Sequence, residues 1–196
     1  MNFNEKYILE NDRVLLRALE EDDFQNLLPF SLNEPEIWQY SLIRADGEDN
    51  LQNYIALACK ARNEEKEYPF IVFDKLKNQY AGVTRLYDIQ PKNKTLQIGY
   101  TWYGKDFQGT GLNKHCKYLL LEFAFEKLDI KRIEFRADAQ NQRSIQAMKS
   151  LGCTEEGILR SHTVKPNGER RDTIVLSILQ QEWFDTIKQK LREKLI

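Results

Sequence analysis

The sequence predicts an α+β domain in which helices flank a mixed, mostly antiparallel sheet. Three apolar segments separated only by short turns, 69–73, 80–86 and 95–102, read as consecutive strands. Strands joined by such short turns pair antiparallel. A glycine-containing loop then leads into a long amphipathic helix over 113–128, so helices must cover the sheet that the strands build.

The N-terminal part contributes one strand and two helices. Val14 to Leu19 reads as a strand, and Asp22 or Asp23 caps a helix that carries Phe24, Leu27 and Leu28 at helical spacing. A second helix is expected over 51–61, where apolar residues recur every three or four positions.

The C-terminal part continues the alternation of strand and helix. Residues 133–137 alternate apolar and charged side chains, as a strand with one buried face does. The remaining expected elements are a helix over 141–151 stopped by Gly152, strands over 157–164 and 171–179 joined at Asn167-Gly168, and an amphipathic helix over 181–196.

Length and charge limit the organisation and the partners. A chain of 196 residues suits one domain, so we expect a single domain over 1–196. With 29 basic and 30 acidic residues the net charge is −1, which gives no bulk attraction to nucleic acid or to anionic membranes. Residues 1–6 lack the apolar core of a secretory leader, so a cytoplasmic location is expected. Three widely spaced cysteines and two histidines indicate no metal site.

The loop from Phe107 to Asn113 is the main candidate for ligand binding. Its Gly109 and Gly111 let a backbone approach an anion, and the helix that follows offers unpaired N–H groups. A tight turn without a ligand would need the same glycines, so both interpretations stay open on the glycines alone. A Walker loop is excluded because Thr110-Gly111 stands where Lys-Ser/Thr is required. A dinucleotide fingerprint is weak, because Lys114 stands where a small residue is needed.

The order of several motifs resembles the GNAT N-acetyltransferase family. Residues 106–111, Asp-Phe-Gln-Gly-Thr-Gly, are similar to the family's pyrophosphate loop, with Asp106 in place of the usual Gln or Arg. Residues 138–153 are similar to its stretch in which Asn, Ser and Leu-Gly-Phe follow in that order, here Asn141, Ser144 and Leu151-Gly152-Cys153. Residues 155–160, with Gly168 and Arg171-Asp172, look like the subgroup that modifies ribosomal-protein N-termini. The resemblance implies the GNAT fold and acetyl-CoA as the acyl donor.

The same resemblance implies a set of donor-binding residues. Gly99, on the strand where the family has a bulge, would bring backbone N–H groups to the acyl carbonyl and the pantetheine, and Lys114 and Lys117, with Arg143, would neutralise the 3′-phosphate. The cofactor-binding residues expected in this way are Ile98, Gly99, Thr101, Gln108, Gly109, Thr110, Gly111, Leu112, Asn113, Lys114, Asn141 and Arg143. Asn113 and Asn141 can each also cap a helix.

The catalytic candidates are Ser144, Asn141 and Tyr100. A serine at position 144 resembles the subgroup residue that protonates the departing thiolate. Many members of the family take the amine proton with a glutamate near Ile98, where Gln97 stands here. The proton acceptor is therefore open among four carboxylates, which are Asp88, Glu134, Asp138 and Asp172.

Acceptor binding is expected at Trp38, Tyr40, Arg85 and Tyr87. The predicted activity is transfer of an acetyl group from acetyl-CoA to a primary amine, a protein N-terminus or a small amine, by direct attack in a ternary complex. A catalytically inactive CoA-binding sensor and a nucleotide-binding protein are the alternatives. We also expect a monomer or a homodimer that binds no metal, no nucleic acid and no membrane.

Overall fold

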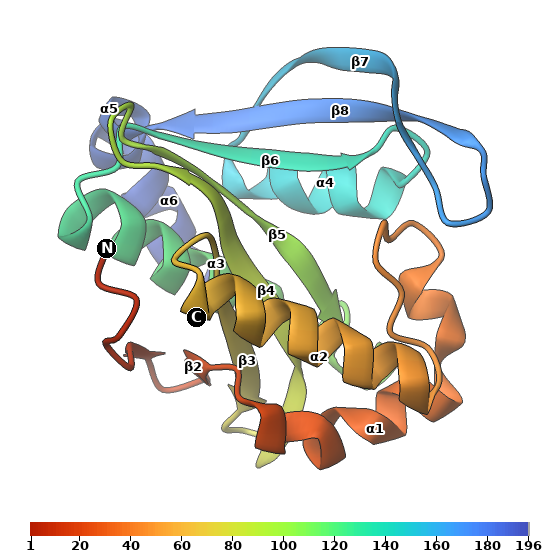
Figure 1. Ribbon diagram of the computed structural model, residues 1–196. Helices are drawn as coiled ribbons and strands as arrows, with labels where there is room; N and C mark the ends of the chain where they lie inside the picture. The colour runs from red at the N-terminus through yellow and green to blue at the C-terminus, as the bar shows by residue number, and fades with distance from the viewer. Residues whose placement is uncertain (196) are drawn as a thin grey trace.

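A computed structural model describes residues 1–195, and its centre is one eight-stranded sheet (Figure 1). The strand order is β1-β2-β3-β4-β5-β6-β8-β7. Every neighbouring pair is antiparallel except β5 and β6, which run parallel. The strands are β1 (Ile8–Glu10), β2 (Val14–Ala18), β3 (Tyr68–Asp74), β4 (Gln79–Gln90), β5 (Thr95–Tyr103), β6 (Arg132–Asp138), β7 (Thr154–Val164) and β8 (Arg170–Leu179). The predicted mixed, mostly antiparallel sheet is confirmed.

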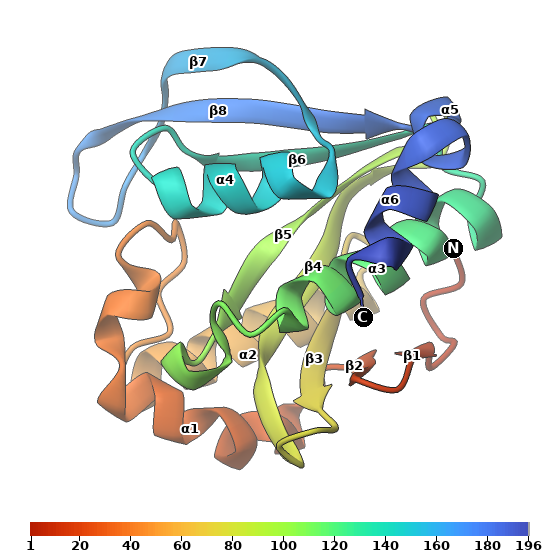
Figure 2. The same cartoon turned by 180° about the vertical axis from the view of Figure 1, so that it is seen from behind.

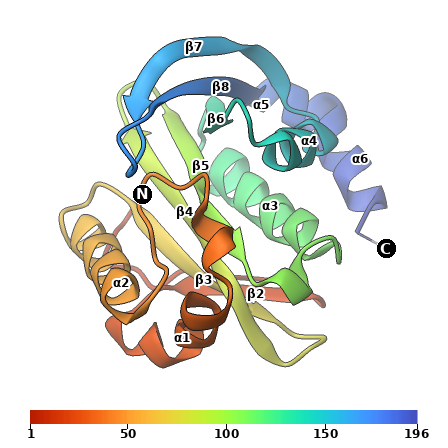
Figure 3. The ribbon, with the colours of Figure 1, turned by 90° about the vertical axis from the view of Figure 1, so that its right-hand side faces the viewer.

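Helices cover both faces of this sheet. Figure 3 shows α1 and α2 on one side, and α3, α4 and α6 on the other. The helices are α1 (Phe24–Asn33), α2 (Glu48–Asn63), α3 (Leu112–Glu122), α4 (Gln142–Leu151), α5 (Gln180–Glu182) and α6 (Lys188–Glu193). No helix within residues 1–195 is long and apolar enough to cross a membrane.

Two apolar clusters lie on the two faces. One packs beneath α3 and contains Phe70 and Val72 of β3, whereas the other packs beneath α2 and contains Ile71 of the same strand. Because β3 is buried on both faces, its sequence is a continuous apolar run rather than an alternation. β6 has one face in the core, with Ile133 and Phe135 buried, and its intervening side chains are charged.

The sheet divides between β5 and β6. The two strands pair only from Thr95 opposite Arg132 to Gln97 opposite Glu134. Beyond that point β5 stays with β4, and β6 stays with β8, so the strands diverge (Figures 1 and 2). This divergence places the functional cleft.

Some boundaries differ from the sequence-based expectation. The helix expected over 113–128 is α3 followed by a π-helical turn, Phe123–Lys127. The helix expected over 181–196 starts at Gln180, contains a second π-helical turn and ends at Glu193, and residue 196 lies outside the described residues. Strand β1 and a 3₁₀ turn, Pro35–Trp38, have too few residues to produce a periodic signal.

Candidate active site

A cleft of about 1040 Å³ opens where β5 and β6 diverge. On one side it is lined by the loop before α3 and by the start of α4. On the opposite side it is lined by residues 36, 37 and 39–43 and by side chains from β7 and β8. The two halves meet at Gly99 and Tyr100 of β5. The lining therefore comes from elements on both sides of the split in the sheet.

Strand β5 bulges at this point. Val83 of β4 lies opposite Trp102, but Arg85 lies opposite Gly99, so β5 carries one extra residue between them. At the bulge, Tyr100 has a φ of 49°. This left-handed conformation is energetically unfavourable for a tyrosine. The bulge expected beside Gly99 is confirmed.

Gly99 is needed because the Tyr87 ring packs closely against its backbone, and not because of an unusual backbone angle. A Cβ atom there would lie 2.7 Å from Cε1 of the Tyr87 ring, so any larger residue would push that ring away. The rings of Tyr87 and Tyr100 meet edge to face, with their centroids 4.9 Å apart. These contacts fix the shape of the cleft at its centre.

The loop before α3 presents backbone N–H groups. Gly109 and Gly111 have φ values of 75° and 86°, which favour glycine. Within residues 1–195, the N–H groups of Gly109, Thr110, Gly111 and Asn113 have no hydrogen-bond acceptor. Because these donors lie at the positive end of α3, the loop is suited to a pyrophosphate.

Side chains brace this loop. Gln108 donates to the Tyr103 carbonyl at 2.6 Å, and Arg143 of α4 donates to the Gln108 side chain. The Asn113 side chain accepts a hydrogen bond from the Tyr103 hydroxyl at 3.2 Å, and Gly111 rather than Asn113 takes the N-cap position. The capping role considered for Asn113 is therefore wrong.

Lys117 does not lie on an exposed helix face with Lys114, as the sequence suggested. Its side chain is buried, and Nζ donates to Thr84 Oγ1 at 3.0 Å and to Thr101 Oγ1 at 2.7 Å. Burial lowers the pKa of this ammonium to about 8. Lys117 contacts the strand beneath the bulge, so its proposed contact with the 3′-phosphate has no support here.

Asn141 and Ser144 lie at the start of α4. The side chain of Asn141 caps the helix, because its Oδ1 accepts from the Ser144 backbone N–H at 3.0 Å. Both residues line the cleft, and the amide NH₂ of Asn141 has no acceptor within residues 1–195. Capping therefore leaves the amide NH₂ free to donate into the cleft.

The expected donor-side residues gather around the cleft with two exceptions. Thr110 and Leu112 do not line it, since the Thr110 hydroxyl turns back to the Phe107 carbonyl and Leu112 is buried. Those that line it are Ile98, Gly99, Thr101, Gln108, Gly109, Gly111, Asn113, Lys114, Asn141 and Arg143.

The four expected acceptor-binding residues divide into two pairs. Tyr40 and Tyr87 line the cleft. Trp38 is 1% exposed and packs on Trp102, and Arg85 is 3% exposed and forms an ion pair with Glu67 at 2.6 Å. The latter two lie behind the cleft wall, which corrects the expectation that they form it.

Arg85 nevertheless shapes the acceptor half from behind. Its guanidinium carbon lies 4.3 Å from the ring centroid of Tyr100 and 5.3 Å from that of Tyr54. Burial is the main cause that raises the pKa of Tyr100, so this phenol keeps its proton at neutral pH.

Two of the four candidate carboxylates reach the cleft. Glu134 is paired with Arg132 and Arg136, Asp172 accepts from the Ser161 N–H, and neither lines the cleft. Asp88 lines it and accepts from the Gln97 amide at 2.8 Å.

Asp138 is the better-placed carboxylate of the two. It lines the cleft and is 3% exposed, and its Oδ1 accepts from the Gln140 N–H at 2.9 Å. Its Oδ2 is buried without a hydrogen-bond partner and lies 3.4 Å from Lys165 Nζ. That oxygen is available to a proton or to a bound amine.

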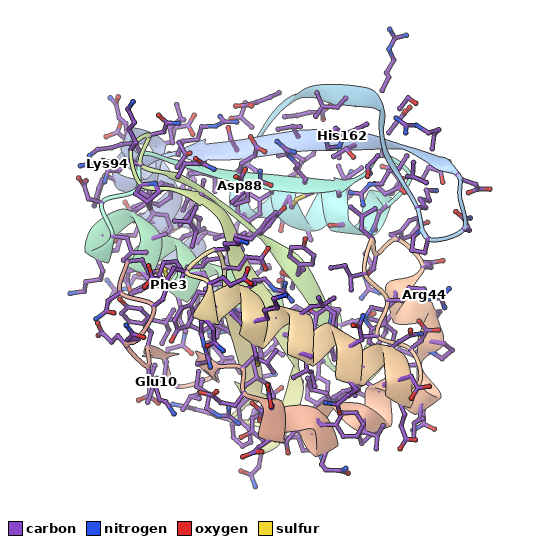
Figure 4. All side chains as sticks on the ribbon, viewed as in Figure 1. Phe3, Glu10, Arg44, Asp88, Lys94 and His162 are labelled. Atoms are coloured by element: carbon purple, nitrogen blue, oxygen red, sulfur yellow. The ribbon has the colours of Figure 1, made fainter. Side chains whose placement is uncertain are left out.

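β7 and β8 also contribute to the cleft, at Arg171 and His162, which the family resemblance places near it, and at Thr173, which the sequence did not indicate. Arg171 and Thr173 of β8 line the cleft, as does His162 of β7, whose Nδ1 lies 3.1 Å from Thr173 Oγ1. Figure 4 shows His162 and Asp88 on the face that carries α2. The alternation of side chains along β8 predicts which of its residues share one face of the sheet. It does not predict which strand lies beside them.

A sheet that divides beside a bulged strand, with a nest of N–H groups at the next helix, is the arrangement expected of the N-acetyltransferase class. Residues 13–154 match the family model described as "Acetyltransferase (GNAT) domain". The chain belongs to the GNAT family of acetyltransferases.

Individual proteins support this assignment. "Putative ribosomal N-acetyltransferase YdaF" of Bacillus subtilis is 31% identical over 102 residues, which cover 52% of this chain and 55% of that protein. The spermidine N(1)-acetyltransferase of Escherichia coli K12 is 24% identical, with 87% of this chain and 88% of that protein covered. The crystal structure of a GCN5-related N-acetyltransferase from Brucella melitensis superimposes with a TM-score of 0.91 at 25% identity, and the match covers 100% of this chain and 88% of that one.

Proposed function

We propose that this protein transfers the acetyl group of acetyl-CoA to a primary amine by direct attack within a ternary complex. The observation that carries the proposal is the cleft itself, whose two halves meet at the bulge of β5. A donor entering past α3 and an acceptor entering past β8 reach the same point without exchanging places. Such an arrangement supports direct transfer, which needs both substrates bound together.

The donor half supports binding of CoA. The unpaired N–H groups of Gly109, Thr110 and Gly111 suit the pyrophosphate, and Lys114 and Arg143 add positive charge to the same rim. Asn141 would hold the pantetheine arm through its free amide NH₂. The bulge at Tyr100 would direct backbone donors at the thioester oxygen.

An amine that arrives as an ammonium must lose one proton before it attacks and a second proton when the amide forms, and the departing sulfur must gain one. We propose that Asp138 takes the proton from the amine, directly or through a water. The amine nitrogen then forms its bond with the carbonyl carbon, and negative charge develops on the carbonyl oxygen. When that charge returns, the bond from carbon to sulfur breaks, the nitrogen releases its second proton to water, and Tyr100 or Ser144 donates a proton to the thiolate. The products are an N-acetyl amine and free CoA.

The acceptor half does not favour a polyamine. Asp88 and Asp138 bring negative charge to its lining, but Arg136 and Arg171 bring positive charge to the same wall. A molecule with several ammonium groups would meet both. We therefore propose an acceptor with a single reacting amine, a class that includes the N-terminus of a protein.

Two measurements test the proposal. Calorimetry should show that CoA binds, and CoA should bind more tightly than ATP. Release of free thiol from acetyl-CoA should then depend on an added amine. If CoA binds tightly but no amine in a broad panel is acetylated, the chain is a CoA-binding sensor. If ATP binds more tightly than CoA, the donor assignment is wrong.

A further inference from the structure

Arg171 of β8 is a buried cation with no carboxylate at ion-pair distance within residues 1–195, and Asp138 acts on it only through a longer-range attraction. It is 7% exposed, and its one hydrogen bond within residues 1–195 is a long one, from Nη1 to the Tyr40 carbonyl at 3.4 Å. Its Nε is buried and has no acceptor. A guanidinium has five N–H donors, so most of the hydrogen-bonding capacity of Arg171 is unused.

This arrangement is costly unless an anion completes it. A buried charge is ordinarily paired and hydrogen-bonded, as Arg85 is with Glu67 at 2.6 Å behind the same wall. Arg171 lines the cleft, so its missing partner can be supplied by a ligand. A planar guanidinium binds a carboxylate through two parallel hydrogen bonds, which makes a carboxylate the fitting group.

The position of Arg171 identifies which substrate brings that carboxylate. Asp138 lies opposite Thr173 in the pairing of β6 with β8, two residues along β8 from Arg171. All three line the acceptor half, on the side of the sheet away from α3 and its N–H groups. A carboxylate held there and an amine beside Asp138 would belong to one small molecule.

We propose that the acceptor is a small amino acid whose carboxylate binds Arg171 while its amine faces Asp138. This inference rests on the proposed function, because it names the acceptor for the same cleft. Tyr40 covers Arg171 through its carbonyl, and Tyr87 lies at the centre of the cleft. The aromatic lining suits an acceptor with an apolar side chain.

Paired amines test the inference directly. L-phenylalanine and L-phenylalaninamide differ only in the carboxylate, so their acetylation rates are compared per unprotonated amine. The native protein should prefer L-phenylalanine by roughly 10- to 100-fold, the range for a hydrogen bond to a charged group. Arg171→Gln should abolish the preference, and Arg171→Lys should keep part of it. Arg160→Gln removes an exposed arginine that does not line the cleft, and should keep all of it.

A binding measurement separates this inference from the proposed function. Calorimetry with N-acetyl-L-phenylalanine and its amide, added to the CoA-bound protein, should show the same preference and the same loss in Arg171→Gln. If the preference appears in binding but no amine is acetylated, the proposed function fails and the carboxylate site stands. If the amide is acetylated and bound as well as the acid, the carboxylate site is wrong and the acetyltransferase stands.

Two further outcomes would also overturn it. A preference for succinyl-CoA over acetyl-CoA that disappears in Arg171→Gln would mean that the acyl group brings the carboxylate. Acetylation of a peptide beginning with aspartate, without acetylation of free amino acids, would mean that Arg171 reads a protein N-terminus.

Discussion

Lys117 Nζ donates a 2.7 Å hydrogen bond to the hydroxyl of Thr101, the residue that follows the strained Tyr100 in the bulge of β5. A second bond, to Thr84, reaches the neighbouring strand β4. One ammonium on α3 therefore joins the helix that begins at the N–H nest to the strand that carries the bulge. The two halves of the donor site are held at a fixed distance by this contact.

Replacing Lys117 with methionine should slow transfer without unfolding the protein. The Thr84 and Thr101 hydroxyls lie 2.8 Å apart, so they can satisfy each other once the ammonium is gone. A small shift of the bulge should still lower kcat, by about tenfold to 100-fold, because misplacement near 1 Å has that cost. Steady-state kinetics with acetyl-CoA measures it, and an unchanged kcat would show that the bulge keeps its position without Lys117.

The same lysine predicts a dependence of stability on pH. Its pKa of about 8 in the folded protein lies below the reference value for lysine of about 10.4. Between these values the unfolded chain binds the proton and the folded one does not, so this group makes stability rise with pH. Urea unfolding from pH 7 to 11 should therefore show the native protein gaining stability relative to Lys117→Met. A constant difference would contradict the lowered pKa.

Gly111 and Gly168 provide a matched pair for the pyrophosphate nest. Each has a φ of 86°, and a Cβ at either position would meet no atom within 4 Å. Alanine should therefore cost each a similar amount of folding stability, roughly 1–2 kcal/mol for a left-handed conformation. Only Gly111→Ala should weaken CoA binding, since Gly168 lies in the hairpin between β7 and β8. Equal CoA affinity in the two variants would remove Gly111 from the donor site.

All three cysteines should be inert towards thiol reagents in the folded protein. Cys59, Cys116 and Cys153 are buried, and burial raises the pKa of Cys116 to about 11 and that of Cys153 to about 12. Labelling with Ellman's reagent at pH 7.5 should be slow in buffer and should reach three thiols in denaturant. Fast labelling of any one of them in buffer would contradict its burial.

Ser144 and Tyr100 can be separated as donors of the proton to the leaving thiolate. The Ser144 hydroxyl has no hydrogen-bond partner within residues 1–195, so Ser144→Ala should leave stability and CoA affinity unchanged. If Ser144 is the donor, kcat falls in Ser144→Ala and holds in Tyr100→Phe, and the reverse identifies Tyr100. The loss should be modest, because a thiol with a pKa near 8.5 is already a fair leaving group. If kcat holds in both variants, neither residue acts as the acid.

The sequence could predict the features that depend on neighbouring residues, and it could not predict those that depend on contacts between distant segments. The nest at Gly109 and Gly111 and the cap at Asn141 depend on a few consecutive residues, and both are where the pattern placed them. Lys117 and Arg85 differ from the prediction because their burial depends on which strand faces them across the sheet. A sequence rich in acidic residues does not reveal that Arg171 lacks an ion pair, which emerges from the structure of residues 1–195.

Variants of Asp138 and Glu134, both on β6, test which carboxylate accepts the proton of the amine. Both carboxylates lie on the same side of β6, four residues apart, but Glu134 is held by Arg132 and Arg136 outside the cleft. Asp138→Asn keeps the size of the side chain and an oxygen for the Gln140 N–H. It should lower kcat by about 10² to 10⁴, the range for loss of a general base, whereas Glu134→Gln should change kcat little.

The pH profile distinguishes a base from a residue that only shapes the cleft. As the pH rises towards the pKa of the attacking α-amine, solvent removes the proton that Asp138 would otherwise take. The deficit of Asp138→Asn should therefore shrink with increasing pH, while a structural defect would stay constant. A constant deficit, with the Glu134→Gln variant fully active, would leave Asp88 as the one candidate carboxylate that lines the cleft within residues 1–195.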